Sequence, residues 1–191
     1  MKSLLKVIQL YNSEKALIKK AMRDNREAQK MLFEIHSPKM LSVCRYYIKD
    51  LQHAEEVMLN GFFKVFSNLK NFKNEGSFEG WIRRIMVNES ISFLRKQKKI
   101  ELLVEDVEIQ YDYSDETDTD IDAEVIQQLI DNLPEGYKMV FIMYAIEGYK
   151  HHEIAEQLNI SEGTSKSQLF KARKLLKQQI NEINKTSYGT E

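Results

Sequence analysis

A stripe of cationic and amide side chains is the first pattern in this sequence that could do chemistry. Its members follow one another at intervals of four, three and four residues, which a helix would bring onto one side: Arg84, Asn88, Ile91 and Arg95. Arginine side chains hold phosphate groups, and an amide can hydrogen-bond the edge of a base. The stripe therefore predicts contact with nucleic acid.

Aromatic residues lie next to this stripe in the sequence. Phe72 lies within a short polar loop, residues 71–77, and Phe78 and Trp81 follow the loop in the predicted helix. Aromatic rings beside a basic helix can stack on bases that have left a duplex. Aromatic residues at helical spacing are also common in hydrophobic cores, so both interpretations stay open for this cluster.

Residues 150–164 have the pattern of a helix-turn-helix, in which a second helix packs across a short first one. Small and apolar residues predict the buried side: Ile154, Ala155, Leu158, Ile160, Ser165, Leu169, Ala172 and Leu176. The predicted outward face of the second helix carries Lys166, Ser167, Phe170, Lys171 and Lys174. Such basic and hydroxyl groups can hold phosphates, and the first residues of the helix can reach base edges in the major groove. An ordinary helical hairpin with a solvated basic face is the alternative.

A metal site is the competing interpretation of the same segment. His152 and Glu156 lie four residues apart and could share a helix face with His151 nearby. No further ligand follows at a recognisable spacing, and the single cysteine, Cys44, is distant. The sequence also lacks a nucleophile with an adjacent base and a glycine-rich phosphate loop. We therefore expect no metal, no cofactor and no enzymatic activity.

The composition favours helices throughout. Of 191 residues, 42% are hydrophobic and 30% are charged, which suits one medium domain or two small ones. Seven glycines and two prolines are too few for a turn-rich β-sandwich or barrel. No stretch is apolar enough for a membrane span, and the charged start is unlike a signal peptide. We predict an all-α protein of the cytoplasm.

The near-neutral total of 28 basic and 29 acidic residues hides a strong asymmetry. Residues 61–100 carry nine bases and three acids, and residues 148–185 carry seven bases and four acids. Between them, residues 101–124 carry eleven acids and no base. Two basic blocks around an acidic one are typical of two modules with a linker. The linker is either a solvated tether or a mimic of nucleic acid that occupies a basic channel in a partner.

The predicted helices must position these patterns. We expect them at residues 14–36, 39–49, 52–68, 78–98, 123–132, 135–147, 150–158 and 161–184. The first break is placed at Ser37-Pro38, because proline disfavours helical geometry in the residue before it. Gly148 suits the end of a helix, and Ser161 suits the N-cap of the next one.

With these motifs, the chain resembles the extracytoplasmic-function sigma factors of the sigma-70 family, and most of all those of Bacteroidetes. The segment from Leu133 through Arg173, with EGYKHHEIAEQLNISEGTSKSQLFKARKLL, closely resembles region 4 of that family. Region 2 resembles HAEEVMLNGFFKVF at residues 53–66, followed by GSFEGWIRRIMVNESISFLRK at residues 76–96. The resemblance implies a region 2 helical bundle at residues 1–98, an acidic linker at 99–122 and a region 4 helix-turn-helix domain at 123–191.

The resemblance also implies a function and partners. A sigma factor binds core RNA polymerase through the β′ clamp helices and the β flap, and directs promoter-specific initiation of transcription. It recognises the minus-ten and minus-thirty-five elements and assists melting, while the linker threads the basic cleft of the polymerase. An anti-sigma factor often masks the polymerase-binding faces in this family.

The family's site residues transfer to matching positions. Polymerase binding is implied for Ala54, Glu55, Glu56, Met58 and Phe62. Contact with the minus-ten element is implied for Asn74, Glu75, Ser77, Phe78, Trp81, Arg84 and Asn88, with a flipped base captured by the loop at 74–78. Contact with the minus-thirty-five element is implied for Glu162, Gly163, Thr164, Lys166, Ser167, Phe170 and Lys171.

Several positions depart from the family pattern. His53 replaces an acid, and Leu59-Asn60 replace a glutamine and an acid, so the charge contacts with polymerase are altered. Ser165 stands where valine is common. Lys171 stands where arginine is common, and lysine keeps the charge but loses bidentate reading of guanine.

Three alternatives to a sigma factor follow from the residues. A stand-alone helix-turn-helix regulator would bind its operator without polymerase. A helical enzyme using His151, His152 and Glu153 would contain a metal. A regulatory scaffold would use the loop before Trp81 only for packing. Co-purification with core polymerase distinguishes the sigma factor from all three.

Overall fold

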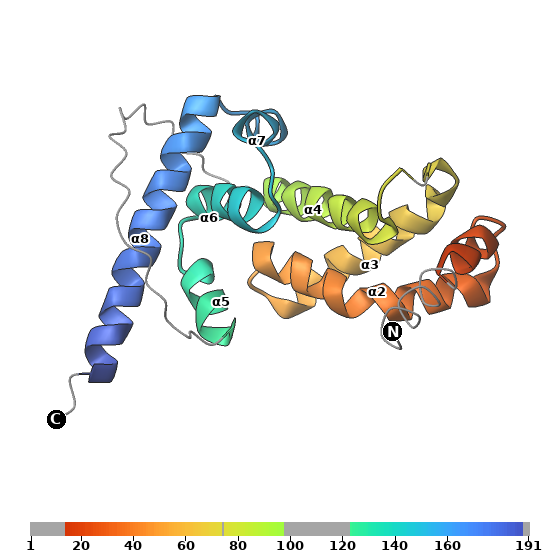
Figure 1. The fold of residues 1–191 in the computed structure, drawn as a ribbon, viewed down its shortest axis with the longest axis horizontal. Coiled ribbons are helices and arrows are strands. Elements are labelled where there is room, and N and C mark those ends of the chain that lie inside the picture. Colours follow the sequence, from red (N-terminus) through yellow and green to blue (C-terminus); the bar gives the residue numbers. More distant parts are fainter. Residues whose placement is uncertain (1–13, 74, 98–122, 189–191) are drawn as a thin grey trace, which may run out of the picture. The chain divides into compact units, whose positions relative to one another are not determined.

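The computed structural model describes residues 14–73, 75–97 and 123–188, and it is drawn in Figure 1. Within these ranges every regular element is helical, which confirms the predicted all-α class. The chain divides into two compact units, Met1–Leu94 and Arg95–Glu191. The predicted acidic linker at 99–122 lies outside the described residues.

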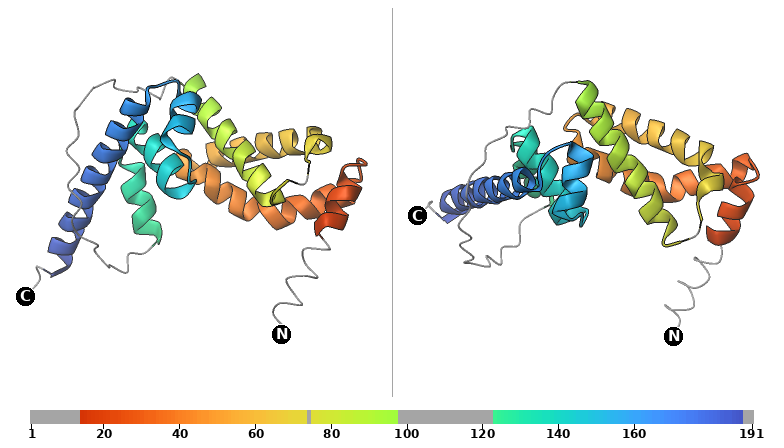
Figure 2. Two further views of the ribbon diagram at one scale, coloured as in Figure 1. Left: turned by 45° about the horizontal axis from the view of Figure 1, so that its top comes forward. Right: turned by 90° about the horizontal axis from the view of Figure 1, so that it is seen from above.

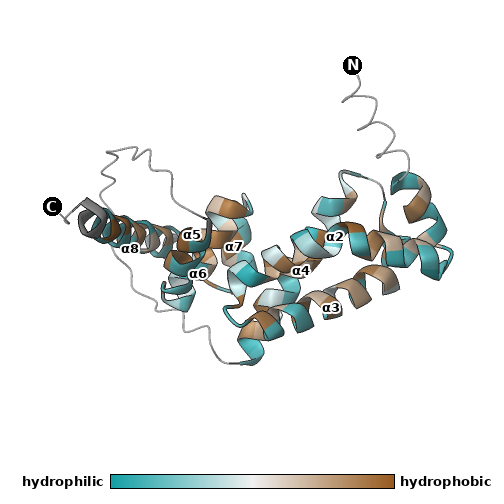
Figure 3. Ribbon diagram, turned by 90° about the horizontal axis from the view of Figure 1, so that it is seen from below, coloured by the Kyte–Doolittle hydropathy of each residue, from teal (hydrophilic) through white to brown (hydrophobic). Residues whose placement is uncertain are grey.

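The first unit contains a helix at residues 14–21, α2 (Arg26–Tyr47), α3 (Leu51–Ser67), the 3-10 turn η1 (Leu69–Asn71) and all but the last two residues of α4 (Phe78–Lys96) (Figures 1 and 2). Helices α2 and α3 pack against each other, and α4 contacts α3 through side chains such as Lys64 and Glu89, which form an ion pair at 2.6 Å. Asp50 caps α3 by accepting a hydrogen bond from the His53 N–H. Hydrophobic and hydrophilic residues alternate along these helices in Figure 3, as expected for helices that each bury one side.

The predicted break at Ser37-Pro38 is wrong, because α2 runs through Pro38 without interruption. Its buried face continues on both sides of the proline, with Leu32 and His36 before it and Met40 after it. Packing of this face outweighs the hydrogen bond that a proline removes from a helix.

The break lies instead at residues 22–25, before α2 begins. Asp24 has a left-handed backbone with φ of 59°, and Asn25 caps α2 by accepting a hydrogen bond from the Ala28 N–H at 2.9 Å. Asparagine and aspartate adopt such conformations and caps readily. Local capping chemistry therefore ends the first helix.

Gly61 lets α3 approach α4 closely. A Cβ atom at this position would overlap the Sδ atom of Met86, which is fully buried on α4. Any larger residue must therefore displace the Met86 side chain within a packed core.

We expect Gly61→Ala to lower the free energy of unfolding by about 1 kcal/mol. Overpacking costs about 1–3 kcal/mol, and the better helix propensity of alanine returns at most about 1 kcal/mol. Fluorescence of Trp81, the single tryptophan, during urea unfolding measures the change. With Met86→Ala already in place, the same substitution should be stabilising. An equal loss in both backgrounds would contradict this account of the contact.

The second unit contains α5 (Ala123–Asp131), α6 (Glu135–Phe141), the π-helical turn η2 (Ile142–Ile146), α7 (His151–Leu158) and α8 (Glu162–Tyr188). Helices α6 and α7 both pack against α8. The core includes Met139, Val140, Ile142, Met143, Ile154, Leu158, Leu169 and Ala172. Among the described helices, none combines the length and the apolar composition that crossing a bilayer requires.

Two of the helix ends in this unit follow the predicted local signals, Gly148 and Ser161. Gly148 has φ of 76° and follows η2. Asn159, which was not predicted, has φ of 56° and ends α7. Ser161 caps α8, because its Oγ accepts a hydrogen bond from the Thr164 N–H at 2.9 Å. The predicted helix at 135–147 differs in its second half, which becomes the π-helical turn.

Candidate nucleic-acid interface

The exposed side of α4 carries the residues that the first pattern in the sequence predicts. Arg84, Asn88 and Arg95 are exposed, and half-buried Trp81 lies one turn before Arg84. Ile91, the fourth member of the predicted stripe, is buried in the core instead. The described part of α4 therefore presents an indole, a guanidinium and an amide along one side, the groups that contact bases and phosphates.

The aromatic cluster before α4 belongs mainly to the core. Phe72 and Phe78 are buried, and their ring centroids are 5.2 Å apart. Trp81 packs on both rings, at 5.3 Å from Phe72 and 5.9 Å from Phe78, and stays half-buried. Of the two interpretations left open, packing holds for both phenylalanines, including Phe78 of the implied minus-ten set.

The loop before α4 is held by hydrogen bonds and by backbone geometry. Ser77 caps α4, because its Oγ accepts a hydrogen bond from the Gly80 N–H at 3.0 Å. Gly76 has φ of 100°, a conformation that glycine adopts most readily. Glu75 and Ser77 are exposed, and Asn74 lies outside the described residues. An ion pair between Glu79 and Lys39 ties the start of α4 to α2.

On α3 the residues implied for polymerase binding fall on two different sides. Glu55 and Glu56 are exposed, whereas Ala54, Met58 and Phe62 are buried in the core, Phe62 with 3% of its surface exposed. The ring of Phe62 packs on Phe33 of α2 at 4.8 Å. These three side chains therefore pack α3 into the core and are not part of its exposed surface.

Sequence reasoning missed the apolar part of the outer face of α3. Leu59 is 54% exposed and lies about one turn beyond Glu56, and Phe63 is 74% exposed and lies one turn beyond Leu59. The signal was present in the sequence, because the buried positions of α3 repeat at helical spacing and leave 55, 59 and 63 on the outside. We call Glu55, Glu56, Leu59 and Phe63 the outer face of α3.

The helix-turn-helix places only part of the predicted set on the outside of α8. Glu162, Gly163, Lys166 and Phe170 are exposed, and Lys171 is half-buried. The placement of Ser167 on the outward face is wrong: it is 4% exposed, and its hydroxyl donates to the Thr164 carbonyl at 3.0 Å. Serine and threonine in a helix often return their hydroxyl to the preceding turn, as happens here.

Thr164 is buried as well, and its polar groups are engaged. Its N–H donates to Ser161 Oγ, and its own hydroxyl lies 2.9 Å from the same atom. The backbone N–H of Thr164 is therefore already engaged by the cap in this arrangement. Glu162 and Gly163 remain at the exposed start of α8.

His151 and Ser165 form a polar contact between the two helices of the motif. His151 Nδ1 lies 2.9 Å from Ser165 Oγ, and the imidazole stacks on the Tyr144 ring at 4.6 Å. Burial lowers the pKa of His151 below its usual value, and the charges of Lys166 and Arg173 lower it further, against the opposing effect of Glu162. The imidazole is therefore neutral at neutral pH.

The described residues contain no group of three His, Cys, Asp or Glu that could hold a metal ion. Cys44 is buried, and desolvation raises the pKa of its thiol to about 11. A thiol with so high a pKa stays protonated and is a poor ligand. The site residues are thus suited to binding, with charge and aromatic surface on the exposed sides of three helices.

Comparison with known proteins matches both units to one family. Residues 32–100 match the family model for sigma-70 region 2, and residues 123–176 match the model for sigma-70 region 4. The order and the spacing of the two matches agree with the division of the chain into two units.

Individual relatives cover most of the chain. It is 31% identical over 134 residues to RNA polymerase sigma factor SigV of Bacillus subtilis, a match that covers 70% of this chain and 80% of that protein. It is 25% identical over 183 residues to the ECF RNA polymerase sigma-E factor of Haemophilus influenzae, covering 88% of this chain and 95% of that protein.

A similar fold occurs in the sigma factor RpoE of Bartonella quintana, crystallised with the anti-sigma factor NepR. The TM-score is 0.53 at 19% identity, and the alignment covers 80% of this chain and 96% of that chain. Two family matches in the right order and a relative above 30% identity establish the relationship. The chain belongs to the sigma-70 family of RNA polymerase sigma factors, in its extracytoplasmic-function group.

Proposed function

We propose that this protein binds core RNA polymerase and directs initiation at promoters with a minus-ten and a minus-thirty-five element. The observation that carries the proposal is the presence, in one sigma-70 chain, of two units that each expose a basic helix side. The exposed side of α4 with Trp81, Arg84 and Asn88 reads and opens the minus-ten element. The start of α8 with Lys166, Phe170 and Lys171 enters the major groove at the minus-thirty-five element.

Docking on polymerase uses the outer face of α3. Leu59 and Phe63 are exposed and apolar, and Glu55 and Glu56 lie beside them, so the face combines an aromatic anchor with negative charge. The β′ clamp helices are its partner. Because Leu59 replaces a polar residue of the family pattern, this docking depends more on apolar burial than the pattern implies.

The two units act together when polymerase holds them. Each unit's DNA contacts are weak alone, and tethering to one polymerase makes the second contact effectively intramolecular. The proposed boundaries are residues 1–98 for region 2, 99–122 for the linker and 123–191 for region 4, with the β flap as partner of region 4. The eleven acids at 101–124 suit passage through a basic cleft.

This function places the protein in the cytoplasm with the polymerase. Because the two segments resemble the sigma factors of Bacteroidetes, we expect the protein to act on promoters of the kind found in those bacteria. Masking by an anti-sigma factor is a further expectation, supported by the exposure of the outer face of α3.

Co-purification with core polymerase tests the proposal. The full chain, tagged and mixed with core polymerase, should elute as a stoichiometric complex, and alone it should bind promoter DNA weakly. Tight binding to one DNA site without polymerase, and no complex with polymerase, would instead show a stand-alone helix-turn-helix regulator.

The loop at 74–78 provides a sharper prediction about melting. Replacing Asn74 and Glu75 with Ala should reduce strand opening about 10-fold. A base that flips out of the duplex loses the free energy of stacking and pairing, and contacts in a shaped polar pocket are needed to offset that loss. Polymerase binding and closed complexes should be unchanged. Permanganate reactivity of the minus-ten thymines measures opening.

A premelted promoter should rescue this double variant, because it removes most of the opening cost. Ser77→Ala is kept as a separate control, since Ser77 caps α4 and its loss should cost about 1 kcal/mol of stability. Full opening by the double variant on duplex DNA would show that the loop is only a connector. A defect that premelting does not relieve would also contradict base capture.

A further inference from the structure

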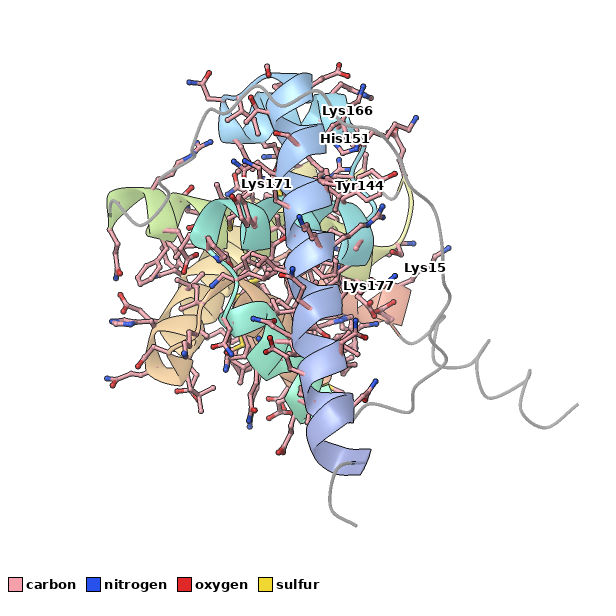
Figure 4. All side chains as sticks on the ribbon, turned by 90° about the vertical axis from the view of Figure 1, so that its left-hand side faces the viewer. Lys15, Tyr144, His151, Lys166, Lys171 and Lys177 are labelled. Atoms are coloured by element: carbon pink, nitrogen blue, oxygen red, sulfur yellow. The ribbon has the colours of Figure 1, made fainter. Side chains whose placement is uncertain are left out.

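A stack of aromatic and charged groups lies beside the start of α8. The Arg173 guanidinium lies 5.6 Å from the centre of the Tyr144 ring, and the Tyr144 ring stacks on His151 at an interplanar angle of 23°. The residues come from η2, α7 and α8. Figure 4 shows His151 next to Lys166, with Tyr144 close by on the same side of α8. Of the residues considered above as metal ligands, only His151 belongs to this cluster.

One nitrogen of the imidazole has a fixed partner inside the motif. His151 Nδ1 lies 2.9 Å from the hydroxyl of Ser165, which is fully buried, while the imidazole itself is half-buried. A hydroxyl both donates and accepts, so it can pair with Nδ1 whether or not that nitrogen carries a proton. The contact therefore holds the ring in one place in both charge states, and leaves Nε2 as the ring nitrogen that would bind a ligand.

The charges around His151 make its protonation depend on what binds there. Lys166 and Arg173 from α8 oppose a positive imidazole, as burial does, and Glu162 from α8 favours it; Tyr144 from η2 contributes a neutral ring. A DNA phosphate next to Lys166 would cancel the repulsion and add an attraction of its own. In a helix-turn-helix the first helix crosses the DNA backbone while the second lies in the major groove. The start of α7, where His151 lies, is thus on the phosphate side.

We infer that His151 is a proton-linked phosphate ligand: it takes up a proton when region 4 binds the minus-thirty-five element, and donates Nε2–H to a backbone phosphate beside Lys166. The inference rests on the proposed function of α8. Ser165, which replaces the valine common in the family, is the positioning residue that makes this contact possible.

The direction of the pH effect follows from the two charge states. The pKa of His151 is lowered in the free protein and is raised by the phosphate in the complex, so binding consumes a proton. Affinity for the minus-thirty-five element therefore increases as the pH falls through the pKa of the bound ring, and levels off below the pKa of the free ring.

Promoter binding by the reconstituted holoenzyme between pH 5.5 and 8.0 tests the inference. The quantity to compare is the ratio of the dissociation constants of a variant and the wild type, so that effects of pH on polymerase cancel. For His151→Gln we expect a ratio near one at pH 8.0 that rises to about tenfold at pH 5.5, the size of a shift of about one pKa unit. His151→Phe, which keeps a ring against Tyr144 but has no proton to gain, should show the same rise.

His152→Gln is the matched control, because His152 is the adjacent histidine and is exposed. Its ratio should stay constant with pH. If the dissociation constants of the wild type and His151→Gln changed with pH in parallel, and binding still depended on the minus-thirty-five element, the role of His151 would be overturned. The proposed function would then still stand. Absence of any minus-thirty-five dependence in the wild type at every pH would overturn the proposed function, and this inference with it.

Discussion

Replacing Phe63 with Ala should weaken binding to core polymerase at least 30-fold, and Phe63→Asp should abolish it. Phe63 is 74% exposed on the outer face of α3, and exposed aromatic anchors buried on association contribute about 2 kcal/mol or more to binding. An aspartate would add a charge that must lose its water in an apolar contact. Titration of fluorescently labelled protein with core polymerase measures the dissociation constant.

The neighbouring Phe62 is the matched control. It is buried, so Phe62→Ala should cost about 3–5 kcal/mol of unfolding free energy, whereas Phe63→Ala should change it by less than about 0.5 kcal/mol. The two adjacent phenylalanines thus separate binding from stability. Wild-type affinity of Phe63→Asp for polymerase would contradict docking through the outer face of α3.

Replacing Lys166 and Lys171 with Ala should weaken holoenzyme binding to minus-thirty-five-dependent promoters by about 10- to 100-fold. Both lysines lie in the first three turns of α8, where we propose that phosphate and base contacts are made. Each lost phosphate contact should also lower the slope of log affinity against log salt by about one, so the double variant should lose about two. Affinity measured from 50 to 200 mM salt gives both values.

Lys177→Ala supplies the control on the same helix. Lys177 is exposed on α8 one residue beyond the range matched to region 4, and Figure 4 shows it farther along the helix than Lys166 and Lys171. Its removal should leave affinity and salt slope nearly unchanged. A salt slope equal to wild type in the Lys166 and Lys171 double variant would refute their phosphate contacts.

Much of the fold could be predicted because helical periodicity directly reports which side is buried. In the predicted stripe, Ser165, Leu169 and Ala172 are buried as expected and Leu176 is half-buried. Gly148 and Ser161 end and begin helices through local backbone chemistry. The error at Pro38 arose from giving a local preference more weight than a continuous buried face. Asn25 is an equally local signal, but its N-cap lies where the packed helix α2 begins, so local chemistry and packing agree there.

The candidate site was harder to predict, because a residue type does not say where its polar group points. Ser167 has the chemistry to hold a phosphate, yet its hydroxyl returns to its own helix. On α3, the polymerase-binding residues implied by the family resemblance include both buried Met58 and exposed Glu55. Helical periodicity would have identified Phe63 as a further residue of the exposed side. The pairing of His151 with Ser165 joins residues 14 positions apart across a turn, so only the tertiary structure reveals it.

Transcription reconstituted from purified core polymerase and this chain tests the central claim most directly. With genomic DNA as template, the complete mixture should produce transcripts from discrete start sites that share one minus-ten and one minus-thirty-five sequence at constant spacing, and core polymerase alone should not. The Lys166 and Lys171 double variant should lose start sites that depend on the minus-thirty-five element. Transcripts with the same distribution in the presence and absence of the protein would show that it does not give polymerase its promoter specificity.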